Sequence, residues 1–217
     1  MKKLVLVSLV LIICSCSPGL KIQKSYQADD IDFNHLKNST ITLGGVNSIS
    51  LSEFINTFND EYSDSTKLDN KIENDFTSQF YKLIPSVTTV KMSEKFPSFL
   101  TGELSFKENR NEEASEFFKG LQTDYLLFIN NIDVGNAYNS YVYSTGGNTM
   151  ATGQTENCVV NIEVELWDVM QQKRIMKFRA GGEKSVVLFS YLAALDDAIE
   201  NSVITAVEYI KNDGKLN

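Results

Sequence analysis

Apolar and polar residues recur at strand and helix intervals from Ser39 onward. The β-branched residues over 40–46 predict a first strand. Ser50 and Glu53 follow at capping-box spacing, which predicts a short helix behind that strand. The apolar residues expected on this helix are Leu51, Phe54, Ile55 and Phe58.

The next helix has the clearest pattern in the first half of the chain. Asp64 or Ser65 can cap its start, and Pro85 ends it. Its apolar stripe comprises Leu68, Ile72, Phe76, Phe80 and Leu83. We expect a short strand over 87–92, and then a further helix behind the cap candidate Asn111.

A nearly continuous apolar run follows Asp124 and occupies 125–132, as in a strand buried on both faces. The polar, glycine-containing stretch over 135–157 is typical of a long hairpin tip or a mobile loop. Beyond it, residues 160–167 alternate strictly between apolar and polar, and a second strand is expected over 175–178. This pattern predicts an antiparallel hairpin with one wet face.

The chain closes with an amphipathic helix. Its buried stripe is expected to contain Leu192, Leu195, Ile199, Val203, Ala206 and Ile210. The order of elements predicts a single α+β or α/β domain over 39–217. We expect a mixed sheet of about five strands with helices, which ends in the antiparallel hairpin and this last helix.

The segment before this domain has the order of a secretory signal. Lys2 and Lys3 precede an apolar run over 4–13, and small residues follow the run. A transmembrane helix needs roughly 20 apolar residues, so this run is too short to span a bilayer. We therefore assign 1–15 to a removable signal peptide. The polar residues 16–38 are expected to form a tether that lifts the domain off the membrane.

Two cysteines end this segment, and Cys16 is the better lipid acceptor. Ile13 lies three positions before it and Ser15 lies next to the expected cut, an arrangement that resembles the lipobox of bacterial lipoproteins. For Cys14 the residue next to the cut would be the bulky Ile13. The resemblance implies a diacylglycerol on Cys16, cleavage before it, and stable anchoring by two or three acyl chains. The alternative is an ordinary secretory signal with incidental cysteines.

Composition and charge narrow the classes of partner. A hydrophobic fraction of 42% fits a folded chain, and the formal net charge of -8 becomes -10 once Lys2 and Lys3 leave with the signal. No basic cluster remains to neutralise phosphates, so binding to nucleic acid or to anionic lipid head groups is not supported. Cys158 is then the remaining free thiol, which excludes an internal disulfide. We expect it to be a small buried strand residue rather than a nucleophile.

The second half of the chain is similar to a group of envelope α/β domains. The matching pieces are Asp124 to Leu127, Leu166 to Asp168, Gly181 with Gly182, and Ala193 to Ala206. The group includes the amino-terminal domain of TolB, the periplasmic domain of the curli secretion lipoprotein, and the outer-membrane lipoproteins that activate penicillin-binding proteins. The resemblance implies a role in binding protein partners rather than in catalysis.

Residues suited to metal binding are scarce. His35 is the only histidine, and it lies in the polar tether, where a solvated side chain is expected. Asp29, Asp30 and Asp32 are closely spaced, but the turn glycine and the distal glutamate of a calcium loop are missing. We therefore expect neither a metal nor a cofactor.

Acid pairs are the remaining candidates for catalysis. Glu163 and Glu165 are predicted on one strand face, and Asp196, Asp197 and Glu200 lie one turn apart on the last helix. An exposed strand face offers no cleft and no raised pKa, and a solvated helix face is the common explanation for the second group. An acid-pair hydrolase is thus a remote alternative, and we expect no enzyme.

Tyr138, Tyr141 and Tyr143 are the candidates for a binding surface. Aromatic residues on a polar loop combine contact area with a hydrogen-bonding tip, as protein-binding and sugar-binding surfaces do. The alternative is that they alternate on a hairpin and pack onto the sheet. We expect a non-enzymatic lipoprotein that docks onto another envelope protein through this loop. The alternative hypothesis is a lipoprotein that binds a small ligand or a glycan through the same loop.

Ser17 indicates which membrane the lipoprotein is expected to occupy. It stands where inner-membrane lipoproteins of enteric bacteria carry a retaining aspartate, so the outer membrane is favoured, with the domain facing the periplasm.

Overall fold

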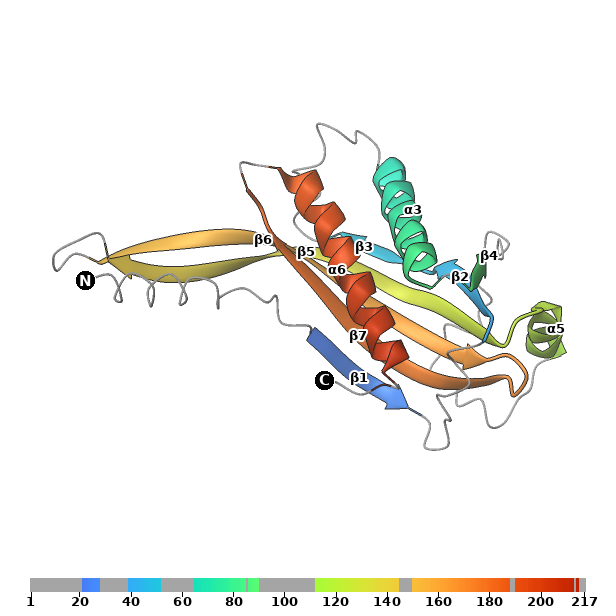
Figure 1. Ribbon diagram of the computed structural model, residues 1–217. Helices are drawn as coiled ribbons and strands as arrows, with labels where there is room; N and C mark the ends of the chain where they lie inside the picture. Colours follow the sequence, from blue (N-terminus) through green and yellow to red (C-terminus); the bar gives the residue numbers. More distant parts are fainter. Residues whose placement is uncertain are drawn as a thin grey trace.

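The computed structural model describes residues 21–27, 39–51, 65–84, 86–89, 112–144, 150–187, 190–212 and 214. They form one mixed sheet of seven strands with helices packed against it (Figure 1). The strand order is β1-β7-β6-β5-β2-β4, and β3 also pairs with β5. The strands are β1 (Lys21–Gln27), β2 (Ile41–Val46), β3 (Ile49–Leu51), β4 (Val87–Thr89), β5 (Tyr125–Ser144), β6 (Met150–Asp168) and β7 (Lys173–Ser185).

The predicted fold class is confirmed. The sheet is mixed because β2 and β3 pair with β5 in parallel, whereas β5, β6, β7 and β1 follow one another antiparallel. The hairpin of β6 and β7 lies where the alternation predicted it, and the last helix lies where its apolar stripe predicted it. The sequence pattern indicated five of the seven strands and missed β1 and β3.

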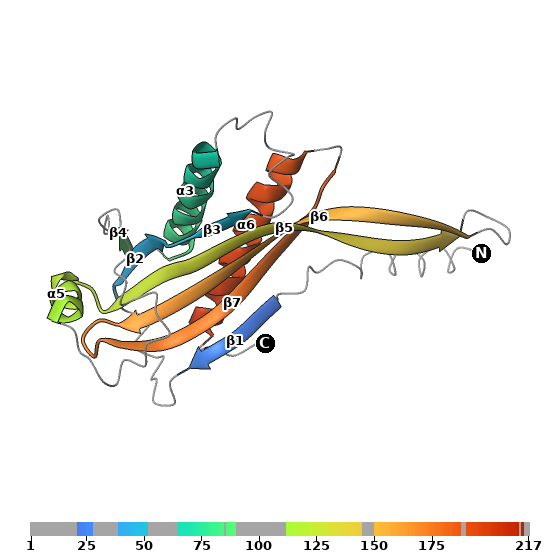
Figure 2. The ribbon, with the colours of Figure 1, turned by 180° about the vertical axis from the view of Figure 1, so that it is seen from behind.

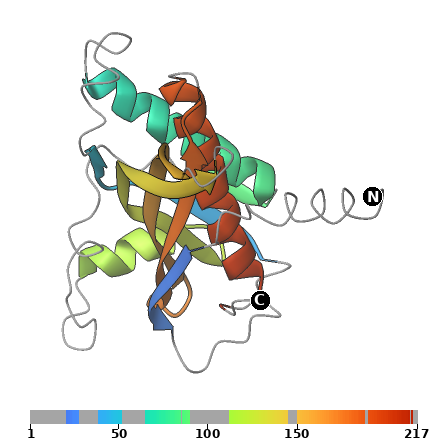
Figure 3. The ribbon, with the colours of Figure 1, turned by 90° about the vertical axis from the view of Figure 1, so that its left-hand side faces the viewer.

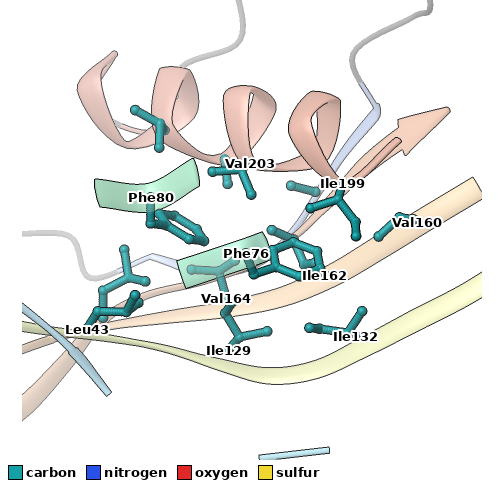
Figure 4. Packing of buried hydrophobic residues seen from close by; sticks show 14 of the residues in the cluster. Leu43, Phe76, Phe80, Ile129, Ile132, Val160, Ile162, Val164, Ile199 and Val203 are labelled. Atoms are coloured by element: carbon teal, nitrogen blue, oxygen red, sulfur yellow. The ribbon is translucent and has the colours of Figure 1, made fainter. Parts of the chain in front are cut away.

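Two helices cover one face of this sheet, α3 (Ser65–Leu83) and α6 (Tyr191–Lys211). Figure 4 shows Phe76 and Phe80 of α3 beside Ile199 and Val203 of α6, above the apolar residues of β5 and β6. All four side chains are fully buried. The stripes predicted for both helices therefore form the main core, which fixes both helices on the sheet.

The first part of β5 is buried on both faces, as its apolar run predicted. Leu127 and Ile129 belong to the core under α3 and α6. Leu126 and Phe128 point the other way and belong to a second cluster. Because side chains alternate along a strand, a continuous apolar run requires cover on both sides, and the fold supplies it here.

Helix α5 (Glu112–Gly120) provides the cover on the second face, on the opposite side of the sheet from α3 and α6 (Figure 3). Its Phe118 lies 5.9 Å from Trp167 between ring centroids, and Trp167 is 2% exposed. Glu165, on the same strand face, is also buried. The prediction of a wet face on this hairpin is therefore wrong at this end, because α5 covers Trp167 and nearby cations enclose Glu165.

Helix α6 lies directly against β7 at Gly182. A Cβ atom on Gly182 would lie 2.1 Å from the backbone oxygen of Ala198 and 2.4 Å from the backbone nitrogen of Ser202. No side chain fits in that space. The glycine therefore sets how closely the last helix approaches the sheet.

The amino-terminal edge of the sheet differs from expectation. Residues 16–38 were predicted as a tether, with folded structure beginning at Ser39. Strand β1 lies inside that range and pairs antiparallel with β7, from Lys21 opposite Gly181 to Gln27 opposite Met176. Ile22 packs against the main core. That part of the prediction is wrong, because pairing with an exposed edge orders a segment that has little apolar content of its own.

Strands β5 and β6 continue beyond the rest of the sheet as a two-stranded ribbon that projects from the body (Figures 1 and 2). Residue pairing is regular from Ile132 opposite Ile162 to Ser144 opposite Met150. Of the two alternatives for 135–157, a long hairpin tip or a mobile loop, the described residues of this stretch form the hairpin.

Several predicted features lie outside the described residues: the signal peptide, Cys16, residues 28–38 and most of the helix expected after Ser50. Leu51, expected on that helix, is instead the last residue of β3. The helices of the described part include none with the length and apolar content needed to cross a membrane.

Candidate functional site

The projecting ribbon is the candidate site. β3 accompanies β5 only as far as Leu51 opposite Val134, and β7 accompanies β6 only as far as Ser185 opposite Asn157. Beyond these pairs, 138–144 and 150–156 form strand pairs with each other in the part of the chain that the structure describes, and Val186 N donates one further backbone hydrogen bond to Glu156 O at 2.8 Å. We call these two paired segments the ribbon.

The ribbon carries almost no charge. The stretch 135–155 contains no Asp, Glu, Lys or Arg, although these residues make up 22% of the chain. Glu156, at the base of the ribbon, is the first charged residue after Asp133. Long-range electrostatic attraction therefore contributes little to any contact that the ribbon makes, and shape, apolar area and hydrogen bonds remain.

Large apolar side chains are exposed on and beside the ribbon. Tyr138 is 58% exposed, Tyr141 50% and Val142 65%, and Val187, just after β7, is 61% exposed. The other exposed large apolar side chain of the described part is Met170, in the turn at the opposite end of the sheet. Among the described residues, exposed apolar area is therefore concentrated on the ribbon and at its base, which is the usual mark of a contact surface.

The three predicted tyrosines do not form one patch. Successive residues of a strand point to opposite faces, so Tyr138 lies on one face of the ribbon and Tyr141 on the other. Tyr143 lies in β5 with its backbone opposite Ala151, on the same face as Tyr141, and its side chain is outside the described part. Two separate aromatic faces result, one on each side of the ribbon.

Tyr141 is held by its cross-strand neighbour, Gly153. A Cβ atom at position 153 would lie 2.5 Å from the Cζ atom of Tyr141, so the hydroxyl end of the ring packs against the glycine. This packing fixes the ring while leaving half of its surface in solvent. An ordered but exposed aromatic ring loses little conformational entropy when it binds a partner.

Tyr138 is held by hydrogen bonds at the base of the ribbon. Its hydroxyl donates to Oε1 of Glu156 at 3.1 Å, and Asn136 Nδ2 donates to the same carboxylate oxygen at 3.1 Å. The second oxygen, Oε2, accepts from the hydroxyl of Tyr191 at 3.0 Å. This bond raises the pKa of Tyr191, with burial and the negative charge of Glu156 acting in the same direction. The cluster joins the ribbon to the first residue of α6.

Cys158 lies near this cluster, and its thiol is unreactive at neutral pH. It is fully buried on β6, and burial, together with the charge of Glu156, raises the pKa of its thiol to about 12. The thiolate, which is the reactive form, is absent at neutral pH. The expectation of a small buried strand residue is confirmed.

The acid pair on the second face of the sheet is neutralised by cations. Lys177 Nζ lies 2.7 Å from Glu163 Oε1 and 3.3 Å from Glu165 Oε1, and Arg174 Nη1 lies 3.4 Å from Glu165 Oε1. Burial favours the neutral form of Glu163, but hydrogen bonds from Lys177 and Asn130 outweigh it and lower its pKa. A general acid requires the opposite shift, so this arrangement does not suit acid catalysis.

Two of the acidic candidates on α6, Asp196 and Asp197, form ion pairs on the helix side. Asp196 and Lys71 join α6 to α3, and Asp197 pairs with Lys184 at 2.8 Å. No group of three or more potential ligands that could hold a metal ion occurs in the described part of the chain. His35, Asp29, Asp30 and Asp32 are outside it.

Sequence reasoning missed two residues of the site, Glu156 and Tyr191. Glu156 lies four positions before the strictly alternating run that begins at Val160, and Tyr191 is 35 positions further along than Glu156. No spacing rule connects them. The absence of charge over 135–155 was a usable signal, because it ends at Glu156.

Comparison with known proteins adds distant likenesses only. No family model matches the chain, and no curated protein matches it in sequence. Among solved structures, a protein from Helicobacter pylori described as a neuraminyllactose-binding hemagglutinin homolog has 9% identity and a TM-score of 0.45, covering 82% of this chain and 88% of that chain. The PelC dodecamer from Paraburkholderia phytofirmans has 11% identity and a TM-score of 0.38, covering 87% and 96%.

A hypothetical protein from Chlamydia trachomatis has 6% identity and a TM-score of 0.40, covering 81% of this chain and 92% of that chain. Likenesses at this level carry no argument about what the present chain does.

Proposed function

We propose that this protein is a non-enzymatic lipoprotein, anchored through Cys16, that docks onto another envelope protein through the ribbon. The observation that carries the docking role is the concentration of exposed apolar side chains on a projecting element. A ribbon that projects from one end of the body can present both of its faces to a partner (Figure 1). Aromatic residues held in place by neighbours, as Tyr138 and Tyr141 are, suit the role of binding anchors.

A glycan or small-ligand site is less well supported. Such sites are concave and gather several groups around one ligand. Tyr138 and Tyr141 lie on opposite faces of a two-stranded ribbon, so they do not line one pocket. A surface with two aromatic faces instead suits a protein that grips the ribbon from both sides.

Catalysis by the acid pair is disfavoured for a separate reason. Glu163 has a lowered pKa and forms an ion pair with Lys177, and Glu165 is buried between cations. Glu163 therefore lacks the raised pKa that a glycosidase acid needs, and the ion pairs leave neither carboxyl free to act on a substrate.

The anchoring part of the proposal rests on the lipobox. Ile13 and Ser15 stand in register before Cys16, and Ser17 favours the outer membrane. A palmitate analogue fed to cells should label the wild type and not Cys16→Ser, which should stay unprocessed or be released as a soluble chain. Cys14→Ser is the matched control and should be labelled normally. Loss of label in Cys14→Ser alone would move the anchor to Cys14.

The docking part is tested by shortening the ribbon. Residues 139–155 are replaced by Asn-Gly, a pair that favours the two-residue turn of a hairpin, so that the turn directly follows the paired Tyr138 and Glu156. None of the described residues removed belongs to either hydrophobic cluster, so the body should fold. Crosslinking in intact cells should then recover no partner.

Met170→Ala is the control for this experiment, because Met170 is 87% exposed and lies at the opposite end of the sheet. It should retain the crosslinked partner. A partner that is recovered equally well with the shortened ribbon would place the docking surface on the body.

A further inference from the structure

We propose that the short connection between the lipid on Cys16 and β1 holds the ribbon along the membrane surface, so that its docking partner is a protein embedded in that same membrane. This inference rests on the proposed anchoring and docking, and it names the class of partner. It follows from where β1 begins, from the lengths of the paired strands and from the lack of charge on the ribbon.

The connection between the lipid and the folded domain is short. β1 begins at Lys21, so residues 17–20 are all that separates it from Cys16. An extended chain advances by at most about 3.6 Å per residue, so Lys21 lies within about 18 Å of Cys16 whatever the conformation of these residues. The acyl chains place Cys16 at the bilayer surface. The start of β1 is therefore held close to the bilayer.

The start of β1 lies at the end of the body from which the ribbon projects (Figures 1 and 2). Lys21 pairs with Gly181 of β7, and Gly181 pairs with Asn161 of β6. Asn161 in turn pairs with Asp133 of β5, just before the ribbon. The anchor is thus attached beside the base of the ribbon.

The lengths of the strands restrict the direction in which the ribbon can point. On the body side of this row of pairs, β7 extends from Gly181 back to Lys173, which is about 26 Å at the usual rise of a strand. If the ribbon pointed away from the bilayer, this part of the sheet would have to fit between Lys21 and the bilayer. The connection allows only about 18 Å there. The ribbon therefore points along the bilayer surface or towards it.

Insertion of the ribbon straight into the bilayer is disfavoured by its length and polarity. From Asp133 to Ser144, β5 spans about 36 Å, which is about twice the reach of the connection. A ribbon pointing straight down would bury its outer half in hydrocarbon. That half carries the exposed polar side chains of Ser140 and Gln154, whose burial in an apolar medium is costly. The ribbon therefore runs along the surface.

A protein embedded in the same membrane fits this position better than lipid head groups do. Tyr138 and Tyr141 lie on opposite faces of the ribbon, so a flat bilayer meets only one of them, whereas a protein can contact both. The stretch 135–155 has no charge with which to attract head groups. A partner in the same membrane is also kept at a high effective concentration near the ribbon.

The test is photo-crosslinking from position 142 in cells that carry the lipidated, full-length chain. Val142 is 65% exposed, so a photo-reactive amino acid in its place should leave the fold intact. A flexible spacer of about 30 Gly and Ser residues, inserted after Pro18, releases the ribbon from the surface while the lipid stays in place. The same spacer added after Asn217 is the matched control, because it leaves the connection to the lipid unchanged.

The captured protein, identified by mass spectrometry, should stay in the membrane when alkaline washing removes peripheral proteins. The spacer after Pro18 should weaken the crosslink about tenfold, and the spacer after Asn217 should not change it. Capture of a protein that alkaline washing removes, or equal crosslinking with both spacers, would overturn the inference and leave docking through the ribbon intact. Capture of lipid alone would show that the occupant is wrong. No crosslink from position 142 would contradict docking itself.

The orientation of the ribbon can be measured without a partner. Lipidated protein with Val142→Cys or Met170→Cys is labelled with a fluorophore and reconstituted in phosphatidylcholine vesicles that contain an acceptor-labelled lipid. Met170 is 87% exposed at the end of the sheet opposite the ribbon, and Cys158 is buried and should not react. Energy transfer from position 142 should be at least as efficient as from position 170. More efficient transfer from position 170 would show that the ribbon points away from the bilayer and would overturn the inference.

Discussion

The hydroxyl of Tyr191 donates a 3.0 Å hydrogen bond to Oε2 of Glu156, which joins the first residue of α6 to the base of the ribbon. The same carboxylate accepts from Tyr138 on the neighbouring strand. One charged group therefore connects the helix layer, β6 and β5.

The Glu156 cluster predicts coupling between two side chains. Tyr191→Phe should lower the free energy of unfolding by about 1 kcal/mol, the usual contribution of one hydrogen bond. In combination with Glu156→Gln its effect should be clearly smaller than the sum of the two single changes. Additive effects in this double-mutant cycle, measured by denaturant unfolding, would show that the two groups do not interact in solution.

The same pair predicts a dependence on alkaline pH. The pKa of Tyr191 is raised in the folded state, chiefly by its hydrogen bond to Glu156, so the folded protein holds this proton more tightly than the unfolded chain does. The associated stability is present below the unfolded pKa of about 10 and is lost as pH rises through the folded pKa. Unfolding free energy should therefore fall more steeply over that range in the wild type than in Glu156→Gln. Parallel curves would contradict the assigned bond.

The close contact between α6 and β7 at Gly182 predicts that a larger residue there lowers stability. Gly182→Ala would place a Cβ atom 2.1 Å from Ala198 O, so α6 must move away from β7. We expect a loss of about 3 kcal/mol, at the upper end for overpacking. Gly120→Ala is the matched control, because nothing lies within 4 Å of its added Cβ. Equal thermal stability of the two variants would show that α6 is not so closely packed.

The orientation of α6 predicts unequal effects for two neighbouring residues. Ile199 is fully buried in the main core, and its truncation to alanine should cost about 2 to 5 kcal/mol. Asp197 makes a half-exposed ion pair with Lys184, and Asp197→Ala should cost less than about 1 kcal/mol. Melting temperatures of the two variants test this, and similar values would mean that the helix face is reversed.

Cys158 predicts a difference in chemical reactivity between the folded and unfolded chain. Burial raises the pKa of its thiol to about 12, so it should resist iodoacetamide at neutral pH and react once the chain unfolds in denaturant. A Cys16→Ser, Cys14→Ser background leaves Cys158 as the remaining cysteine. Rapid labelling of the folded protein would show that this part of β6 opens readily.

Elements that bury one face could be predicted, because burial imposes a period on the sequence. The helix stripe from Leu68 to Phe80 and the alternation from Val160 to Leu166 both mark the main core. The cover over Trp167 could not be predicted in this way, since it comes from α5, which lies about 50 residues earlier in the chain and leaves no mark in the strand itself.

Part of the candidate site could also be predicted from the sequence. Tyr138 and Tyr141 stood out as aromatic residues in a polar stretch, and the structure places both at about half exposure. The sequence did not decide between a hairpin tip and a mobile loop for the ribbon, because a strand pair with two solvated faces has no apolar alternation. Strand β1 was missed because it is ordered by pairing with β7 rather than by its own composition.

The central claim, docking through the ribbon, is tested most directly by replacing Tyr138, Tyr141 and Tyr143 together by serine. Tyr138 and Tyr141 are at least half exposed, so thermal stability should stay within about 1 kcal/mol of the wild type, as for surface changes generally. In-cell crosslinking followed by mass spectrometry should lose the partner seen with the wild type. Unchanged crosslinking in an equally stable variant would contradict the proposal, and a large loss of stability would show that the tyrosines hold the fold together instead.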